Sequence, residues 1–553
     1  IIFALGASLL LALTVIPVAT SFLLKNTSHH EPWLIRIASR LYAPALDWAL
    51  NNERKIVIAA VMALVAAGYA YTQLGKTFMP TMDEGDIIVS VEALPSINLD
   101  EMNAINVRLQ SAILAKVPDV KSIVARTGSD ELGLDPMGPN QTDTFLVLKP
   151  AEERKTADKS ALIEEVRQVL SNFPGLSLSF TQPIDMRVQE MISGVRGDVA
   201  VKIFGPDIAK LNEIASKLSA ILSGIDGAED VYTTLNEGAQ YYTVVVNRME
   251  AGRLGLTVDA ISNSLRTQIE GRTIGTVLEE GRRTPILVRG SEATREAPTL
   301  LATLPLTLAS GQHVALSQVA HIHRVDGPVV VNRENGNRMS VVRANVRGRD
   351  MVGFVEAARQ KVATDLPLPG GYRLTWGGQF ENQQRAAARL SIVVPVAIGL
   401  IFVLLFTTFG SIRQALLVLV NIPFAVIGGV FSLVLTGEYL SVPASVGFIA
   451  LLGIAVLNGV VLVSYFNQLR AHGVPAGRIV VDGAKRRLRP VLMTASITAL
   501  GLIPLLFATG PGSEIQRPLA IVVIGGLLSS TALTLILLPI LYRRFGGIVK
   551  GSK

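Results

Sequence analysis

The sequence predicts a polytopic α-helical membrane protein that carries a large extracytoplasmic α+β domain, and three observations lead to this class. Hydrophobic residues make up 49% of the 553-residue chain, an excess that is typical of membrane proteins. Seven apolar runs are long enough to cross about 30 Å of hydrocarbon as helices. A segment of about 310 residues with mixed composition separates the second run from the third, and it is far too long to be a loop.

The distribution of basic residues predicts the orientation of these spans. The spans are expected at residues 1–24, 56–74, 390–409, 415–436, 442–466, 491–509 and 518–541. Lys and Arg gather in alternate connections and in the tail, whereas the turns at 437–441 and 510–517 nearly lack them. The basic residues concerned are Lys25, Arg36, Arg40, Arg54, Lys55, Arg413, Arg470, Arg478, Lys485, Arg486, Arg487, Arg489, Arg543, Arg544 and Lys550. By the positive-inside rule, the large domain faces outside.

The segment before the second span, "EPWLIRIASRLYAPALDWAL", alternates apolar with basic and polar residues at helical spacing. Its Trp33, Tyr42 and Trp48 are residue types that favour the membrane interface. We therefore expect an amphipathic helix on the inner leaflet. The basic string "KRRLRP" at 485–490 could suggest contact with lipid or nucleic acid, but it is more typical of a flank that sets topology.

The large domain is expected to consist of repeated strand–helix–strand units. "DIIVSVEAL" alternates as a strand does, "LDEMNAINVRLQSAILAKV" has helical periodicity, and "VKSIVART" alternates again. This pattern recurs along the domain and is typical of small α+β sandwiches. Residues 237–331 differ, because short strands and turns dominate there, and they are expected to form an inserted subdomain.

Several classes of chemistry are excluded by what the sequence lacks. The chain has no cysteine, which excludes disulfides, thiolate metal ligands and cysteine nucleophiles. It contains no GxxxxGK[ST] string, so nothing indicates an ATPase of its own. No Ser/His/Asp or zinc-hydrolase spacing stands out either, and an enzyme is the least supported class.

Long strings of the chain resemble the heavy-metal efflux branch of the resistance-nodulation-division transporters, and within it the cobalt–zinc–cadmium type. The strings are "FMPTMDEGDIIV", "GSDELGLDPMGPNQTDTFLVLKP", "SFTQPIDMRVQEMISGVRGDVAVKIFGPD", "GGQFENQQRAAARL" and "SVPASVGFIALLGIAVLNGVVLVSYFNQL". The resemblance covers essentially the whole chain. It implies the C-terminal half of a proton-driven antiporter, beginning in the sixth helix.

The resemblance also implies an order of domains. These are a transmembrane helix at 1–24, a cytoplasmic amphipathic helix and linker at 25–55, a transmembrane helix at 56–74, a periplasmic porter subdomain at 75–185, a second porter subdomain at 186–236 and 332–388, an inserted docking subdomain at 237–331, five transmembrane helices at 389–542 and a cytoplasmic tail at 543–553. Relatives of this kind sit in the bacterial inner membrane as homotrimers and join a periplasmic adaptor and an outer-membrane channel. No cofactor and no nucleic acid is expected, and the metal is the substrate.

Acidic residues of the large domain are the candidate metal ligands. The candidates are Asp130, Glu131, Asp135 and Asp143 in one cluster, and Asp185 and Glu190 with the adjoining Met191 in another. Carboxylates suit divalent ions, whereas thioethers select Cu(I) or Ag(I). Against a site, "GSDELGLDP" has the composition of a turn, Asp185 could pair with Arg187, and Met191 could be core packing.

Comparison with the copper/silver branch bears on the substrate and on coupling. The resemblance places that branch's three outer-cleft methionines at Ser90, Gln141 and Met191 here, and only one of these is a methionine. A divalent ion such as Zn²⁺, Co²⁺ or Cd²⁺ is therefore expected. The same branch adds a Glu and a Lys in the membrane, at positions that are Leu457 and Val491 here. Proton-relay acids are accordingly expected in the fourth helix, outside this chain.

Asn458 is the one amide in the apolar run "GFIALLGIAVLNGVVLVSYF". Polar side chains inside membranes usually form hydrogen bonds across helices. Asn458 could therefore contact a neighbouring helix, or be satisfied by a nearby backbone carbonyl. Asn458 has no ionisable group, so it cannot carry a proton.

Two other functions stay open at this point. The first is an efflux pump of the same superfamily for organic compounds or lipids, which should line its cleft with aromatic residues. Aromatics are only 6% of this chain, and acidic clusters occupy the domain instead. The second is a non-transporting, membrane-anchored binding module, which would not need so many spans.

Overall fold

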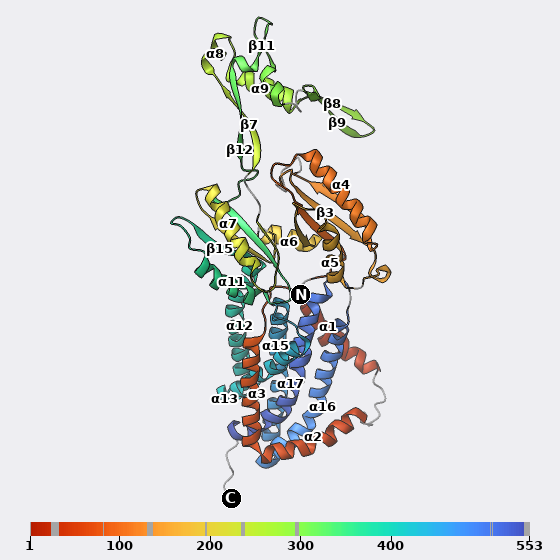
Figure 1. The fold of residues 1–553 in the computed structure, drawn as a ribbon. Coiled ribbons are helices and arrows are strands. Elements are labelled where there is room, and N and C mark those ends of the chain that lie inside the picture. Colours follow the sequence, from red (N-terminus) through yellow and green to blue (C-terminus); the bar gives the residue numbers. More distant parts are fainter. Residues whose placement is uncertain are drawn as a thin grey trace. The chain divides into compact units, whose positions relative to one another are not determined.

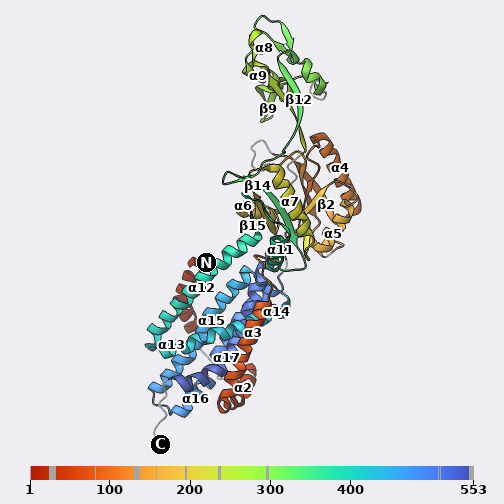
Figure 2. The same ribbon diagram turned by 60° about the vertical axis from the view of Figure 1, so that its left-hand side comes forward.

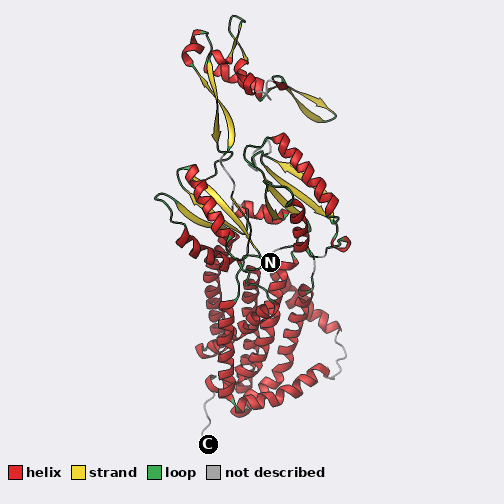
Figure 3. Ribbon diagram, in the orientation of Figure 1, coloured by secondary structure: helices red, strands yellow, loops and turns green. Residues whose placement is uncertain are grey.

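The computed structural model divides into two compact units, which are described separately below. We call residues 1–82 and 383–553 the helical unit, and residues 83–382 the sheet unit. The residues described are 2–23, 33–80, 82–129, 137–156, 158–193, 196–233, 238–293, 298–508, 510 and 512–546. Figure 3 shows helices throughout the helical unit, while strands and helices alternate in the sheet unit.

Helices build the helical unit, and most of them are long and apolar (Figure 1). They are α1 (Ile2–Leu23), α2 (Trp33–Asn51), α3 (Glu53–Gln73), α12 (Gln379–Phe409), α13 (Ile412–Leu419), α14 (Asn421–Thr436), α15 (Val442–Ala471), α16 (Ala476–Leu506) and α17 (Ser513–Phe545). Six spans in the described part are long and apolar enough to cross a membrane, with α13 and α14 counted together, and the stretch Gly6–Phe22 of α1 is a shorter apolar helix. The chain is thus a multi-span membrane protein, as its composition predicts.

Helix α17 is the centre of this unit and packs on α14, α15 and α16 (Figure 2). Small residues bring α14 and α17 close together. A Cβ atom added at Gly428 would lie 2.1 Å from the carbonyl oxygen of Gly525, and the hydroxyl of Ser432 donates to the carbonyl of Ile521 at 3.0 Å. Such contacts replace the hydrophobic effect as the source of helix association inside lipid.

Helix α2 buries one apolar face against protein. Tyr42, Leu46 and Leu50 belong to the core that α15, α16 and α17 form, and the Tyr42 hydroxyl donates to the carbonyl of Leu535 at 2.7 Å. Trp33 and Trp48 remain exposed. The amphipathic helix predicted from the sequence is therefore present, and the face that carries Tyr42 packs against helices instead of facing the membrane interface.

The segment that follows α3 pairs with the turn between α14 and α15. The Leu440 N–H donates to Gly75 O at 2.8 Å, the Thr77 N–H to Leu440 O at 3.2 Å, and the Val442 N–H to Phe78 O at 3.1 Å. This parallel contact holds the main chain of residues 75–78 against the start of α15.

Two α/β layers make up most of the sheet unit. In the first, strands β1 (Ile87–Glu92), β2 (Val120–Thr127), β3 (Gln141–Leu148) and β4 (Ser177–Thr181) lie in the order β2-β3-β1-β4. Helices α4 (Leu99–Lys116) and α5 (Lys159–Leu170) share its core. In the second, β5 (Val199–Phe204), β13 (Arg333–Glu334), β14 (Asn337–Val346) and β15 (Arg373–Gly378) lie in the order β13-β14-β5-β15, and β6 (Ala228–Thr233) also pairs with β14.

Helices α7 (Ile208–Ser223) and α11 (Met351–Asp365) accompany the second sheet, and α6 (Pro183–Ser193) connects the two layers along the chain. Between β6 and β13, strands β7 (Ala239–Val246) and β12 (Ala320–Gly327) pair with each other. They enclose in sequence α8 (Arg248–Arg253), α9 (Val258–Ile269), β8 (Arg272–Glu279), β9 (Arg282–Val288), β10 (Pro305–Thr307) and β11 (His313–Ala315). The predicted class, a helical membrane protein with a large α+β domain, is confirmed. The subdomain limits stay predictions.

Candidate metal-binding site

Asp185 lies in the first turn of α6, and its neighbour Glu84 caps that helix. The Glu84 carboxylate accepts the backbone N–H of Asp185 at 2.8 Å and also the N–H of Ile184. A carboxylate in this position satisfies orphan donors and complements the positive end of the helix dipole. Glu84 thus fixes the start of α6 and brings a second negative charge to Asp185.

Two amides hold the Asp185 carboxylate. Gln189, one turn further along α6, donates at 2.9 Å, and Gln379 donates at 3.2 Å. Gln379 reaches this place because its own N–H bonds to the carbonyl of Asp198 at 3.0 Å. The preceding Gly378 has φ +81° and lies so close to Asp198 O that an added Cβ would be 2.9 Å away, so only glycine fits there.

The pKa of Asp185 is raised to about 6. Burial is the largest cause, the charge of Asp198 is the next, and Glu84 adds to the shift, while the hydrogen bond from Gln189 opposes it. Asp198 is itself held by the N–H of Val346 at 3.0 Å and by Arg347 at 2.8 Å. Asp185 can therefore exchange a proton near neutral pH.

Asp143 has a different environment, although the sequence proposes the same role for it. Its side chain is fully buried on β3. Arg196 donates to both carboxylate oxygens, at 2.7 and 3.0 Å, Arg126 donates at 3.2 Å, and the hydroxyl of Ser90 at 2.9 Å. Burial alone would raise the pKa of Asp143, but Arg196, Ser90 and Arg126 together hold it below its usual range. For Asp143 to bind a cation, Arg196 would have to leave.

The remaining described candidates lie beside this network. Glu190 pairs with Arg187 at 3.0 Å and with Arg196 at 2.6 Å. Met191 is 85% exposed, which argues against the core-packing role considered for it. Asp130, Glu131 and Asp135 lie outside the described residues. Among the residues that the structure does describe, no three His, Asp or Glu side chains converge closely enough to hold a metal ion.

Sequence reasoning missed Glu84 and Asp198 as neighbours of Asp185. Both occur in strings that carry the family resemblance, "TMDEGDIIV" and "GVRGDVAV", but neither string indicates which carboxylates meet. Ser90 and Gln141, the positions of the missing methionines, lie on the adjacent strands β1 and β3. At Ser90, the space is occupied by the contacts with Asp143 and Arg196.

Asn458 is buried in α15 of the helical unit. Its Oδ1 accepts a hydrogen bond from Thr494 of α16 at 3.4 Å. Its Nδ2 has no partner within the described part of the chain. One turn earlier, the carbonyl of Ala455 accepts from Asn421 at 3.3 Å.

Replacing Asn458 by alanine is expected to weaken the contact between α15 and α16 only modestly. Hydrogen bonds between membrane helices contribute about 0.6 kcal/mol on average, and the Thr494 contact is long. Thermal unfolding of the purified protein tests this. A loss above about 1.7 kcal/mol, the largest value found for such bonds, would contradict this account.

Known proteins resemble this chain along nearly its whole length. The cation efflux system protein CzcA of Alcaligenes sp. is 41% identical and covers 98% of this chain and 52% of its own length. Protein HelA of Legionella pneumophila is 43% identical, and the match covers 99% of this chain and 53% of HelA. The chain thus spans about half the length of the curated relatives it matches.

Solved structures agree with this. A heavy metal efflux pump in crystal form II superposes with a TM-score of 0.84 at 36% identity, covering 98% of this chain and 55% of that one. The family model described as the AcrB/AcrD/AcrF family matches residues 1–546. The resemblance predicted from the sequence is therefore confirmed, and the chain belongs to the AcrB/AcrD/AcrF family of the resistance-nodulation-division transporters.

Proposed function

We propose that this chain works in a proton-driven exporter of divalent heavy-metal cations, of which Zn²⁺, Co²⁺ and Cd²⁺ are the candidates. The observation that carries the proposal is Asp185, a carboxylate that has two further acids for neighbours and a pKa of about 6. Oxygen ligands suit borderline and hard divalent ions. Support also comes from the name of a relative that is 41% identical, the cobalt-zinc-cadmium resistance protein CzcA of Cupriavidus metallidurans.

Proton and metal compete for Asp185 in this proposal. A metal ion binds the ionised carboxylate, so affinity is high above pH 6 and falls as the pH drops through about 6. An unperturbed aspartate would lose its metal only near pH 4. Glu84 and Asp198 supply negative charge that attracts the cation. The same charge raises the affinity of Asp185 for a proton, and that proton later displaces the metal. Additional ligands are proposed from Asp130, Glu131 and Asp135.

The assembly belongs to the same proposal. The protein is proposed to be a homotrimer in the bacterial inner membrane, with the sheet unit in the periplasm. A periplasmic adaptor and an outer-membrane channel complete the export path, residues 237–331 dock on that channel, and no cofactor takes part. Cross-links from cysteines introduced at 237–331 to the channel protein test this arrangement.

The proposal is tested with Asp185→Asn in the full-length transporter. This change keeps the side-chain volume and removes the charge, and we expect Zn²⁺ affinity at pH 7 to fall at least about tenfold. Titration calorimetry from pH 5 to 8 should place the loss of wild-type affinity near pH 6. Growth in Zn²⁺, Co²⁺ and Cd²⁺ should fall in parallel.

Asp226→Asn is the matched control, because Asp226 is an exposed aspartate of the same unit. It should bind and export metal as the wild type does. Unchanged Zn²⁺ binding and growth in Asp185→Asn would refute Asp185 as a ligand. Tight Ag⁺ binding by a wild type that ignores Zn²⁺ would refute the divalent substrate.

A further inference from the structure

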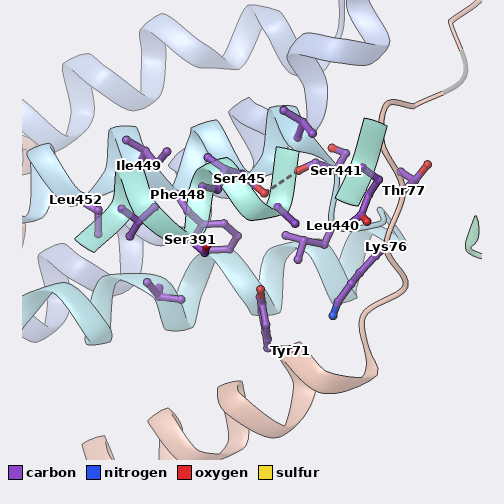
Figure 4. A pocket seen from close by; sticks show the side chains of 16 residues that line it. Tyr71, Lys76, Thr77, Ser391, Leu440, Ser441, Ser445, Phe448, Ile449 and Leu452 are labelled. Carbon is purple, nitrogen blue, oxygen red and sulfur yellow. Dashed lines mark hydrogen bonds between the residues drawn. The ribbon is translucent and has the colours of Figure 1, made fainter. Parts of the chain in front are cut away.

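The helical unit contains a cavity of about 430 Å³ between α3, α12, α14 and α15 (Figure 4). Its volume falls in the range of roughly 300–1,000 Å³ that is usual for small-molecule pockets. All four helices belong to spans that are apolar and long enough to cross a membrane. A molecule in this cavity would therefore lie among membrane-spanning helices.

The cavity has a cationic end and an apolar end. Lys76 and Thr77 lie at one end of the lining, whereas the hydroxyl of Tyr71 points toward its middle, as Figure 4 shows. Phe448, Ile449 and Leu452 of α15 lie toward the other end. Val394 of α12 also lines the cavity. Among the described residues that line the cavity, Lys76 is the one with a charged side chain. Its place is set by the backbone pairing of residues 75–78 with the start of α15.

The serines of the lining add less polarity than the sequence suggests. Ser445 donates its hydroxyl proton to the carbonyl of Ser441 at 3.0 Å, and Ser391 donates to the carbonyl of Ala388 at 2.8 Å. Ser441 accepts the N–H of Ala444 at 3.3 Å, as an N-cap does. These local bonds use the groups that would otherwise favour water, so the cavity suits hydrocarbon beyond its cationic end.

We propose that this cavity holds one acyl chain of a bilayer glycerophospholipid, with the lipid phosphate against Lys76. The charge of Lys76 complements a phosphate, and lysines and tyrosines near the ends of membrane helices are usual partners of headgroups. The apolar end of the cavity holds the acyl chain of the lipid, which needs no polar partner. Lys76 and Thr77, which line the cavity, lie in the segment that follows α3, so a bound lipid would contact that segment.

Native mass spectrometry of the purified full-length transporter, titrated with phosphatidylglycerol, tests the proposal. The wild type should keep a tightly bound phosphatidylglycerol that resists delipidation. Lys76→Ala should weaken this binding about five-fold, the effect expected for one basic residue beside an anionic lipid. Val394→Trp should abolish it, because the indole would occupy part of the cavity that Val394 lines. Phosphatidylethanolamine, which carries a compensating positive charge, should bind more weakly than phosphatidylglycerol.

Two controls keep the test specific. Val393→Trp adds the same bulk to the neighbouring, 51% exposed residue of α12, and Arg389→Ala removes an exposed positive charge from the same helix. Neither residue lines the cavity, so both variants should bind lipid as the wild type does. Equal lipid retention by Val394→Trp and Val393→Trp would overturn the proposal. So would binding of detergent that phosphatidylglycerol does not displace, or a cross-link showing that a helix of another copy fills the cavity.

Discussion

Replacing Asp143 by asparagine is expected to destabilise the first sheet of the sheet unit by about 3 kcal/mol or more. The change leaves Arg196 and Arg126 facing a neutral group in a buried place, and uncompensated buried charge is costly. Glu190 still pairs with Arg196, which keeps the loss near the lower end of the range for broken buried pairs. Hydrogen exchange of the β1 and β3 amides measures the local opening free energy.

The exposed pair Arg108–Glu101 is the matched control. Its guanidinium–carboxylate distance is 3.0 Å, similar to that of the buried pair, but both side chains are more than half exposed. Glu101→Gln should cost under about 1 kcal/mol. Because the pKa of Asp143 is held low, the pair stabilises the fold above the ordinary aspartate pKa of about 4 and loses this effect as the pH falls through the lower folded value. Equal effects of the two substitutions would contradict this account.

Gly428→Ala is expected to disrupt the contact between α14 and α17. The new Cβ would lie 2.1 Å from the carbonyl oxygen of Gly525 and 2.4 Å from the Ser529 hydroxyl. Backbone cannot move aside as a flexible side chain does, so the helices must separate. Overpacking typically costs about 1–3 kcal/mol, and this site should exceed the upper value. Thermal unfolding and detergent resistance of the full-length protein measure the loss.

Gly453→Ala is the control for that substitution. Gly453 lies in α15, and an added Cβ would meet nothing within 4 Å. Its replacement should leave stability unchanged or raise it slightly, because alanine favours the helix. Similar losses at Gly428 and Gly453 would show that a general effect of substitution on expression or folding, and not the α14–α17 contact, determines the outcome.

The spans and the class of the large domain could be predicted from sequence because they depend on local patterns. Apolar runs of sufficient length identify most of the helices, and alternation and helical periodicity identify the strand–helix–strand units. The buried face of α2 could not be predicted in the same way. A helix with Tyr42 and Leu46 on one side has the same pattern whether that side meets lipid or protein. Only the packing of α15, α16 and α17 shows which applies.

The surroundings of Asp185 and Asp143 could not be predicted from the sequence either. Asp185 could be named from the sequence, but its pKa depends on Glu84, about 100 residues earlier in the chain, and on Asp198 beyond the end of α6. Asp143 shows the reverse case. Its sequence context indicates a turn-rich acidic cluster, whereas its burial against Arg196 depends on the register that places Ser90 opposite Asp143. Sheet register is a long-range property, and one residue of slip would turn Asp143 to the other face.

The main-chain bonds between residues 75–78 and the turn before α15 have a mechanical consequence. The three bonds lie side by side along the two paired segments, so tension on the chain beyond Phe78 loads them together, in shear, instead of opening them one at a time. Displacement of residues 75–78 is therefore passed to the backbone at the start of α15. Because α15 is one uninterrupted helix from Val442 to Ala471, it can act as a stiff rod that carries this displacement to the depth of Asn458.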